Sequence, residues 1–69
     1  MNTNKIGGLI KKRRMSLGID QRALSEISGI AVHTLSNIEA GTGSPTVATL
    51  DRVLEALGME IRIQVKEQE

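Results

Sequence analysis

The stretch that decides the fold is residues 20–41, which read DQRALSEISGIAVHTLSNIEAG. Asp20 can cap a helix from Gln21 to about Ser28, because its carboxylate can accept hydrogen bonds from unpaired N–H groups of the first turn. Gly29 can adopt the left-handed backbone that ends a helix. A second helix is predicted from about Val32 to Ala40, and the next glycine ends it in the same way. Two short helices joined by a tight turn are therefore expected.

The apolar residues of this stretch indicate how its helices pack. Leu24 and Ile27 are predicted to face inward from the first helix, and further apolar residues are expected where the two helices cross. The crossing residues are Leu24, Ile30, Leu35 and Ile38. This arrangement is typical of a helix-turn-helix motif. An ordinary helical hairpin has the same requirements, so the spacing alone leaves both interpretations open.

On the N-terminal side, a longer helix is predicted from about Lys5 to Leu17. Asn4 can cap its start and Gly18 can end it. Its apolar residues recur at helical spacing and are expected to form one buried stripe. The stripe consists of Ile6, Leu9, Ile10 and Leu17. Arg13 falls on the same stripe, where its methylene groups can cover the core while its guanidinium reaches water.

On the C-terminal side, a further helix is predicted after Thr46, which can act as its N-cap. Its apolar residues form a complete amphipathic stripe that ends at Gly58. That stripe consists of Val47, Leu50, Val53, Leu54 and Leu57.

The periodicity changes after this helix. From Met59 to Lys66, apolar and polar residues alternate, which is typical of a strand with one buried face. The apolar face carries Ile61, Ile63 and Val65. Because no other segment has the pattern of a strand, this one is expected to pair antiparallel with its copy in a second chain.

These elements predict a mostly α fold, a bundle of about four to five helices with one C-terminal β-strand that pairs across a dimer. Residues 1–58 are expected to form a helix-turn-helix domain and residues 59–69 the dimerisation strand. A chain of 69 residues buries a small core and is marginally stable. It has no cysteine and one histidine, so neither a disulfide nor a metal site can add stability. Dimerisation remains as the source of further stability.

Charge is distributed unevenly, although the formal net charge is only +1. Residues 1–22 carry six basic and one acidic side chain, 6 − 1 = +5, whereas the rest carry three basic and seven acidic ones, 3 − 7 = −4. A basic segment favours a phosphate-rich partner, although a solvated helix face would have the same composition. The chain has no Phe, Tyr or Trp on which unpaired bases could stack. Duplex DNA is therefore favoured over single strands.

The second helix of the central stretch offers a polar outer face. At about 100° per residue, its two inward residues leave four side chains pointing outward, and Val32 is exposed at the N-terminal end of the helix. The four are His33, Ser36, Asn37 and Ala40. Asn37 can pair with an adenine edge through two hydrogen bonds, and Val32 can contact a thymine methyl group. His33 and Ser36 can donate to or accept from several bases. The predicted base contacts are Val32, His33, Ser36 and Asn37, although ordinary surface residues would be exposed in the same way.

The sequence resembles the lambda-repressor-like, or Xre-type, helix-turn-helix regulators over residues 5–58. The matching residues are Ile6-Gly7, Ile10-Lys11, Arg14, Gly18-Ile19-Asp20-Gln21, Leu24, Gly29-Ile30, Thr34-Leu35-Ser36-Asn37-Ile38-Glu39, Gly41, Pro45 and Leu50. Two residues depart from the family pattern, since Ala31 replaces the usual Ser or Thr cap and Ser25 the usual Ala. With the added strand, the layout is most similar to that of the HipB-type antitoxins.

The resemblance implies roles for further residues. Gln21, Thr34 and Thr42 match positions that contact DNA phosphates, although the two threonines could instead satisfy local backbone groups. Gln21 also begins a helix, where unpaired N–H groups suit a phosphate. Arg14 and Glu39 match an ion pair between the first and third helices, and the guanidinium could also reach a phosphate. HipB-type relatives repress their own operon and bind a HipA-like kinase toxin, so the same is implied here.

We therefore expect a homodimeric repressor whose residues 1–58 bind double-stranded operator DNA, and which is the autoregulating antitoxin of a HipA-like kinase. The alternatives are a stand-alone Xre-type regulator and a helical protein-interaction module, although an interaction helix would expose apolar anchors. Scattered acids and one histidine argue against an enzyme, and no cofactor is required. The lack of a leader, of a membrane segment and of cysteine favours a soluble, intracellular protein. The resemblance implies a bacterial protein in the cytoplasm, associated with the nucleoid.

Overall fold

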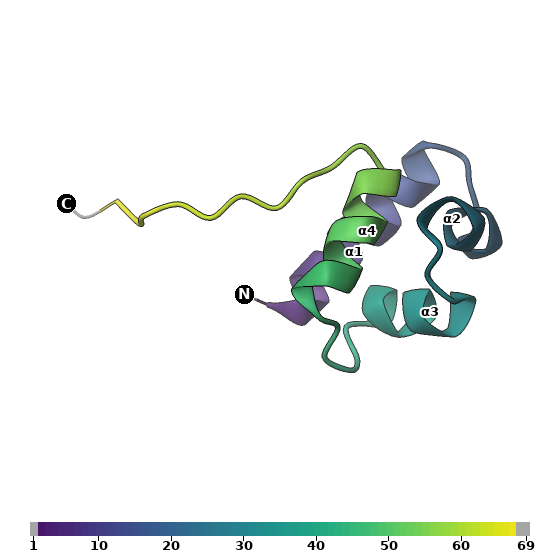
Figure 1. Cartoon of the computed structure of the whole chain (residues 1–69), viewed down its shortest axis with the longest axis horizontal. Coiled ribbons are helices and arrows are strands. Elements are labelled where there is room, and N and C mark those ends of the chain that lie inside the picture. The colour runs from purple at the N-terminus through teal and green to yellow at the C-terminus, as the bar shows by residue number, and fades with distance from the viewer. Residues whose placement is uncertain (1, 68–69) are drawn as a thin grey trace.

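A computed structural model describes residues 2–67 of the chain. It contains four α-helices, α1 (Thr3–Ser16), α2 (Gln21–Ser28), α3 (Val32–Ala40) and α4 (Val47–Ala56). α3 packs against α1 and α2, and α2 also packs against α4. The segment after α4 extends away from the helices (Figure 1). Within residues 2–67, no helix is both long enough and apolar enough to cross a membrane.

The helices of the central stretch begin and end where the sequence predicts. The Asp20 carboxylate caps α2 by accepting a hydrogen bond from the N–H of Ala23 at 2.8 Å. Gly29 follows α2 with a φ of 73°, a backbone conformation that strongly favours glycine. Thr46 caps α4 in a similar way, accepting from the N–H of Thr49 at 3.1 Å. The local signals therefore determine most helix ends.

The start of α1 differs from the prediction. The side chain of Asn2 accepts a hydrogen bond from the N–H of Lys5 at 3.2 Å, so the helix begins at Thr3. Asn4 lies inside the first turn, and a Cβ on Gly41 would overlap its side chain, so the two residues are packed together. The predicted cap at Asn4 is wrong. Either asparagine could cap the helix, but the side chain of Asn4 is packed against the end of α3, and Asn2 is the N-cap. The helix also ends one residue earlier than predicted, at Ser16.

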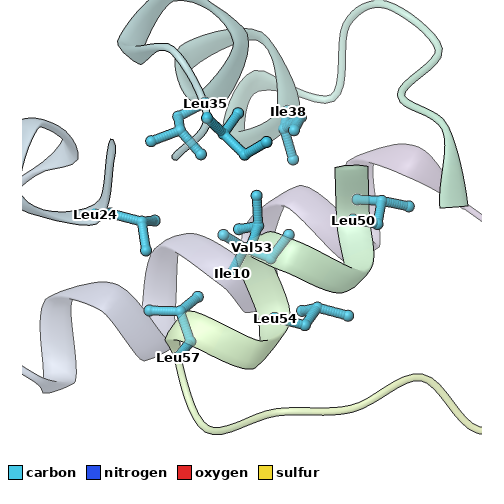
Figure 2. Packing of buried hydrophobic residues seen from close by; sticks show 9 residues of the cluster. Ile10, Leu24, Leu35, Ile38, Leu50, Val53, Leu54 and Leu57 are labelled. Atoms are coloured by element: carbon cyan, nitrogen blue, oxygen red, sulfur yellow. The ribbon is translucent and has the colours of Figure 1, made fainter. Parts of the chain in front are cut away.

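Nine buried apolar residues from the four helices and the adjoining turns form the core (Figure 2). They are Ile10, Leu24, Ile30, Leu35, Ile38, Leu50, Val53, Leu54 and Leu57. The predicted crossing residues of α2 and α3 are all among them. Burial of one such side chain contributes about 1.5 to 3 kcal/mol. The core therefore holds α3 firmly while leaving its other face free.

Four apolar residues that were predicted to be buried are exposed instead. They are Leu9, Leu17, Ile27 and Val47. Leu9, Ile27 and Val47 lie at the edges of their apolar stripes, and Leu17 follows the last residue of α1. Periodicity locates such a stripe but does not determine how much of its width a neighbouring helix covers.

Residues 59–67 are extended, but they do not form the predicted strand. Residues 2–67 contain no second extended segment, so their backbone has no partner for a ladder of hydrogen bonds. Met59 and Ile61 pack against the core, whereas Ile63 and Val65 are 90% and 97% exposed. The bundle therefore consists of four helices and an extended tail. Pairing across a dimer remains a prediction, and residues 68–69 of the predicted dimerisation segment lie outside the described residues.

Candidate nucleic-acid interface

The outer face of α3 carries the four side chains predicted to contact bases. Two core residues anchor the inner face, and the four candidates lie on the opposite side of the helix. Val32 is 42% exposed, His33 and Ser36 are exposed, and Asn37 is half-buried. The structure therefore brings all four together on one accessible surface, which we call the α3 outer face.

Two of these residues touch each other. The Nδ2 atom of Asn37 lies 3.4 Å from the Nε2 atom of His33, one turn earlier on the helix. The roles of the two nitrogens in this contact depend on the tautomer of the imidazole. The oxygen of the Asn37 amide and its second N–H remain available. Those two groups are the ones that can pair with the N6 and N7 atoms of an adenine.

Gly7 determines how closely α3 approaches α1. A Cβ at this buried glycine would overlap the carbonyl oxygen of Ile38 and lie 2.9 Å from that of Glu39. Both atoms belong to the backbone of α3, so any side chain at Gly7 would displace the helix. The sequence alone did not indicate this role of Gly7. The one feature that could have indicated it is the position of a residue without a side chain one turn before Ile10, on the buried stripe.

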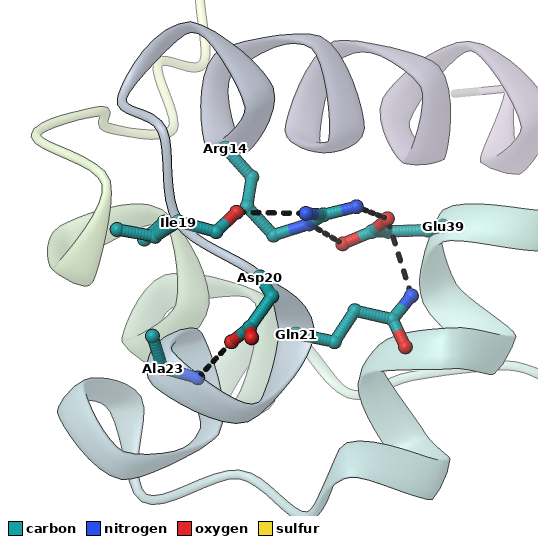
Figure 3. A network of polar contacts seen from close by, with 6 residues as sticks. All are labelled: Arg14, Ile19, Asp20, Gln21, Ala23 and Glu39. Atoms are coloured by element: carbon teal, nitrogen blue, oxygen red, sulfur yellow. Dashed lines mark hydrogen bonds and ion pairs between the residues drawn. The ribbon is translucent and has the colours of Figure 1, made fainter.

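Arg14 joins α1 to α3 through a two-point ion pair (Figure 3). Its Nε and Nη2 atoms donate to the two carboxylate oxygens of Glu39 at 2.8 and 2.9 Å, and Nη1 donates to the carbonyl oxygen of Ile19 at 2.8 Å. The two charged side chains are only 11% and 4% exposed. Hydrogen bonding to Glu39 raises the pKa of Arg14, while partial burial acts in the opposite direction. Only the outer N–H groups of the guanidinium remain for a phosphate.

The same network includes Gln21, the first residue of α2. Its Nε2 atom donates to an oxygen of Glu39 at 3.3 Å, a contact that the sequence reading did not identify (Figure 3). One N–H and the oxygen of the amide remain free for another partner. The start of α2 is thus held against the end of α3, so a phosphate contact from Gln21 would have a fixed position relative to the α3 outer face.

Thr34 and Thr42 border the same shallow hollow beside α3, with a volume of about 180 Å³. The hydroxyl and the N–H of Thr42 both donate to the carbonyl oxygen of Asn37, at 3.2 and 2.9 Å. For Thr42, this is the local backbone role that the sequence left open as the alternative to a phosphate contact. Ser44 lines the hollow as well and was missed, because a serine beside glycine and proline usually indicates only a turn.

The basic residues of the N-terminal segment have different surroundings. Arg13 donates from Nε to the carbonyl oxygen of Leu57 at 2.9 Å, so its guanidinium is committed to the end of α4. Lys5, Lys11 and Lys12 are exposed on α1. Lys11 follows Gly7 by one helical turn and so lies on the side of α1 that adjoins α3. Of the three lysines, Lys11 is the best placed to reach a polyanion bound at α3.

Within residues 2–67, no group of three or more His, Cys, Asp or Glu residues could hold a metal ion. Every side-chain nitrogen or oxygen that is buried in this part of the chain has a hydrogen-bond partner. The polar side-chain groups with free hydrogen-bonding capacity in this part of the chain therefore lie on the surface, where an external partner can use them.

Comparison with known proteins agrees with this geometry. A family model described as helix-turn-helix matches residues 10–64, which include α2, α3 and α4. The chain is also 36% identical over 52 residues to a protein of Methanothermobacter thermautotrophicus (strain Delta H) described as an uncharacterized HTH-type transcriptional regulator. The match covers 75% of each chain. The chain therefore belongs to the helix-turn-helix family of the Xre type.

Proposed function

We propose that this protein binds an operator in double-stranded DNA as a homodimer and represses transcription. The observation that carries the proposal is the α3 outer face, a set of hydrogen-bonding side chains on a helix whose inner face is anchored in the core. A single α-helix fits into the major groove, where each base pair presents a distinct pattern of donors and acceptors. Membership of the helix-turn-helix family and the relative named as a transcriptional regulator support this reading.

In this proposal α3 reads bases and the surrounding residues position it. Val32, His33, Ser36 and Asn37 would contact base edges, and Gln21, Thr34, Thr42 and the outer N–H groups of Arg14 would contact phosphates. Residues 1–58 would be the DNA-binding domain and residues 59–69 the dimerisation segment. A two-fold dimer would present its two α3 helices about 34 Å apart, one turn of duplex, and so read a palindrome. Occupying the operator would exclude RNA polymerase, and the protein would act in the cytoplasm, at the nucleoid.

Selection of bound duplexes from a random library, followed by titration of the selected operator, tests the assignment of roles. The substitution Asn37→Ala is expected to cost about 1 to 3 kcal/mol on the operator and to relax the base preference at one position. Gln21→Ala is expected to weaken binding about equally on operator and random duplexes, because a phosphate contact carries no sequence information. Glu26→Ala, an exposed change on α2, serves as the control. If Asn37→Ala leaves the base preference unchanged, or if both variants lose it equally, the assigned roles are wrong.

The salt dependence of binding provides a second test. Each phosphate that a basic group neutralises releases counterions, so the logarithm of the binding constant should fall linearly with the logarithm of the salt concentration. Lys11→Gln is expected to reduce that slope by about one unit per site. A flat plot would exclude the proposed contacts with the DNA backbone.

The antitoxin role is a finer part of the proposal. It rests on the resemblance of the sequence to HipB-type antitoxins, in which residues 59–69 would correspond to their added strand. The gene next to this one would then encode a HipA-like kinase, and coexpression of this protein would relieve the growth arrest that the kinase causes. A neighbouring gene of another kind, or a kinase whose toxicity is unaffected, would favour a stand-alone regulator.

A further inference from the structure

Asn37 on the α3 outer face is held firmly at its backbone. Its carbonyl oxygen accepts hydrogen bonds from the N–H of Thr42 at 2.9 Å and from the hydroxyl of Thr42 at 3.2 Å. The residue lies within α3 and is half-buried. The main freedom that remains to its side chain is a half turn of the amide, which exchanges the places of the oxygen and the nitrogen. The contacts of the amide therefore determine which of its two orientations faces outward.

The contact that can choose between these orientations is with His33, one helical turn earlier. The Nδ2 atom of Asn37 lies 3.4 Å from the Nε2 atom of His33. An amide nitrogen can donate but not accept, so this contact is a hydrogen bond only in the imidazole tautomer whose Nε2 carries no proton. If Nε2 carried a proton, it would donate to the amide oxygen, and the amide would have to turn over.

We propose that His33 is a positioning residue, which orients the amide of Asn37 for adenine until its own imidazole is protonated. The inference rests on the proposed function and adds a determinant of its base specificity. When Nδ2 donates one N–H to His33, the second N–H and the oxygen of the amide remain for the N7 and N6 atoms of adenine. In the turned amide these two groups have exchanged places, so the same position in the groove no longer matches adenine. The Nδ1–H group of the neutral imidazole stays free for a base of its own.

The imidazole has no charged partner in the free protein. His33 is exposed, on the side of α3 opposite the buried Leu35 and Ile38. α1 and α2 pack against α3, and their charged residues, with the N-cap of α2, are Lys5, Lys11, Lys12, Arg13, Arg14, Asp20, Arg22 and Glu26. Within residues 2–67 none of these is bonded to His33, and Glu39 of α3 is bonded to Arg14 instead. The contact with Asn37 is therefore the one through which a proton on the imidazole changes the α3 outer face.

The effect of pH has a definite sign. The chain has one histidine, and imidazole is the side-chain group that changes charge between about pH 5 and 8. Above this range Nε2 can accept and the amide of Asn37 is oriented, whereas below it Nε2 is protonated and the orientation is lost. The preference for adenine should therefore fall as the pH falls. Overall affinity for DNA should rise over the same range, because the protonated imidazole adds a positive charge near the phosphates.

Nitrogen NMR of the free protein tests the contact without DNA. The shifts of the two ring nitrogens distinguish the tautomer with Nδ1–H from the tautomer with Nε2–H. A hydrogen bond of ordinary net strength changes such a ratio about 2- to 12-fold. At about pH 8, where imidazole is neutral, the ratio of the Nδ1–H to the Nε2–H tautomer should be higher by this factor in the natural chain than in Asn37→Ala. This variant keeps the carbonyl that Thr42 bonds, and equal ratios in the two proteins would overturn the proposal.

Base preference on the selected operator provides the second test. The position read by Asn37 is identified as the one at which Asn37→Ala relaxes the preference. Recognition through two hydrogen bonds discriminates between bases by about 5- to 150-fold. Between about pH 8 and about pH 5.5, the preference of the natural chain for adenine at this position should fall by about 3- to 10-fold. A preference that is the same at both pH values would contradict the role of His33.

Two substitutions of His33 separate positioning from a merely structural role, and both are at an exposed position where folding is unaffected. His33→Gln supplies an amide oxygen that can accept from Asn37 at any pH, so the variant should keep the preference for adenine and lose its pH dependence. His33→Leu supplies no acceptor and should show the low preference at both pH values. Lys66→Gln, in the tail, is the control and should match the natural chain.

Equal preferences in His33→Gln and His33→Leu would overturn the proposal, because a positioning role requires the acceptor. The two tests also separate this proposal from the proposed function. A failure to find any operator would contradict DNA reading by α3, whereas the tautomer ratio of the free protein would still decide whether His33 orients the amide of Asn37.

Discussion

The helical body, residues 3–57, and the C-terminal tail, residues 59–67, differ in how well their apolar side chains are buried and their hydrogen-bonding groups are paired within one chain. In the body, the core residues are buried against one another and the buried polar groups are paired. In the tail, Ile63 and Val65 face solvent and the backbone has no strand beside it. The body is therefore packed within one chain, whereas most of the tail is exposed to solvent.

Ending the chain at Gly58 should separate the two regions most clearly. Helical signal in circular dichroism should remain, because the nine core residues all precede that position. The dissociation constant of the dimer should rise by at least about 100-fold, since loss of even two buried apolar contacts per tail removes several kcal/mol. Sedimentation measures the change. An unchanged dimer mass at micromolar concentration would place the interface on the helices instead.

The two ion pairs allow the next comparison. Arg14→Met should lower the free energy of unfolding by about 2 to 4 kcal/mol, because it leaves the nearly buried Glu39 carboxylate without its partner. Arg62 pairs with Glu60 at 2.8 Å in the tail, where both side chains are exposed, and exposed pairs contribute little. Arg62→Met should therefore cause no measurable loss in urea denaturation. Equal losses in the two variants would contradict the contrast between body and tail.

Two adjacent glycines test the contact between α1 and α3. Gly7→Ala should destabilise the body by about 1 to 3 kcal/mol, because its Cβ would overlap the backbone of α3. At Gly8 nothing lies within 4 Å of a Cβ, and Gly8→Ala should stabilise the helix by about 0.5 to 1 kcal/mol. Thermal unfolding of both variants gives the comparison. Gly7→Ala should also weaken operator binding, and a stable variant with normal binding would show that α3 tolerates displacement.

The smallest expected effect is a gain. Ala31 precedes α3 in an extended conformation but makes no side-chain cap, so Ala31→Ser should stabilise the body by about 0.5 to 1 kcal/mol. The variant should unfold at higher urea concentration, with the dissociation constant of the dimer unchanged in sedimentation. A stability gain that appears only at high protein concentration would mean that Ala31 acts through the dimer.

The features of the candidate site that depend on neighbouring residues were predicted from the sequence. Contacts between residues far apart in the chain were not predicted from the residue pattern. Leu35 and Ile38 are buried as their spacing indicates, which places Asn37 and His33 on the other side of α3. The Arg14–Glu39 contact was expected from the family resemblance alone. The two residues are 25 positions apart, and an arginine or a glutamate does not indicate by its type which distant residue it pairs with. The link between Gln21 and Glu39 was missed for the same reason.

The amino-acid sequence by itself determined the helices of the central stretch, their caps and the apolar residues at their crossing, because capping and periodicity act over a few neighbouring residues. Tertiary structure decided which asparagine caps α1, since Asn4 is held against Gly41. It also decided that Leu9 and Val47 stay exposed and that Gly7 lies directly against the backbone of α3. These outcomes depend on distances between segments far apart in the chain, and only the packed core determines such distances.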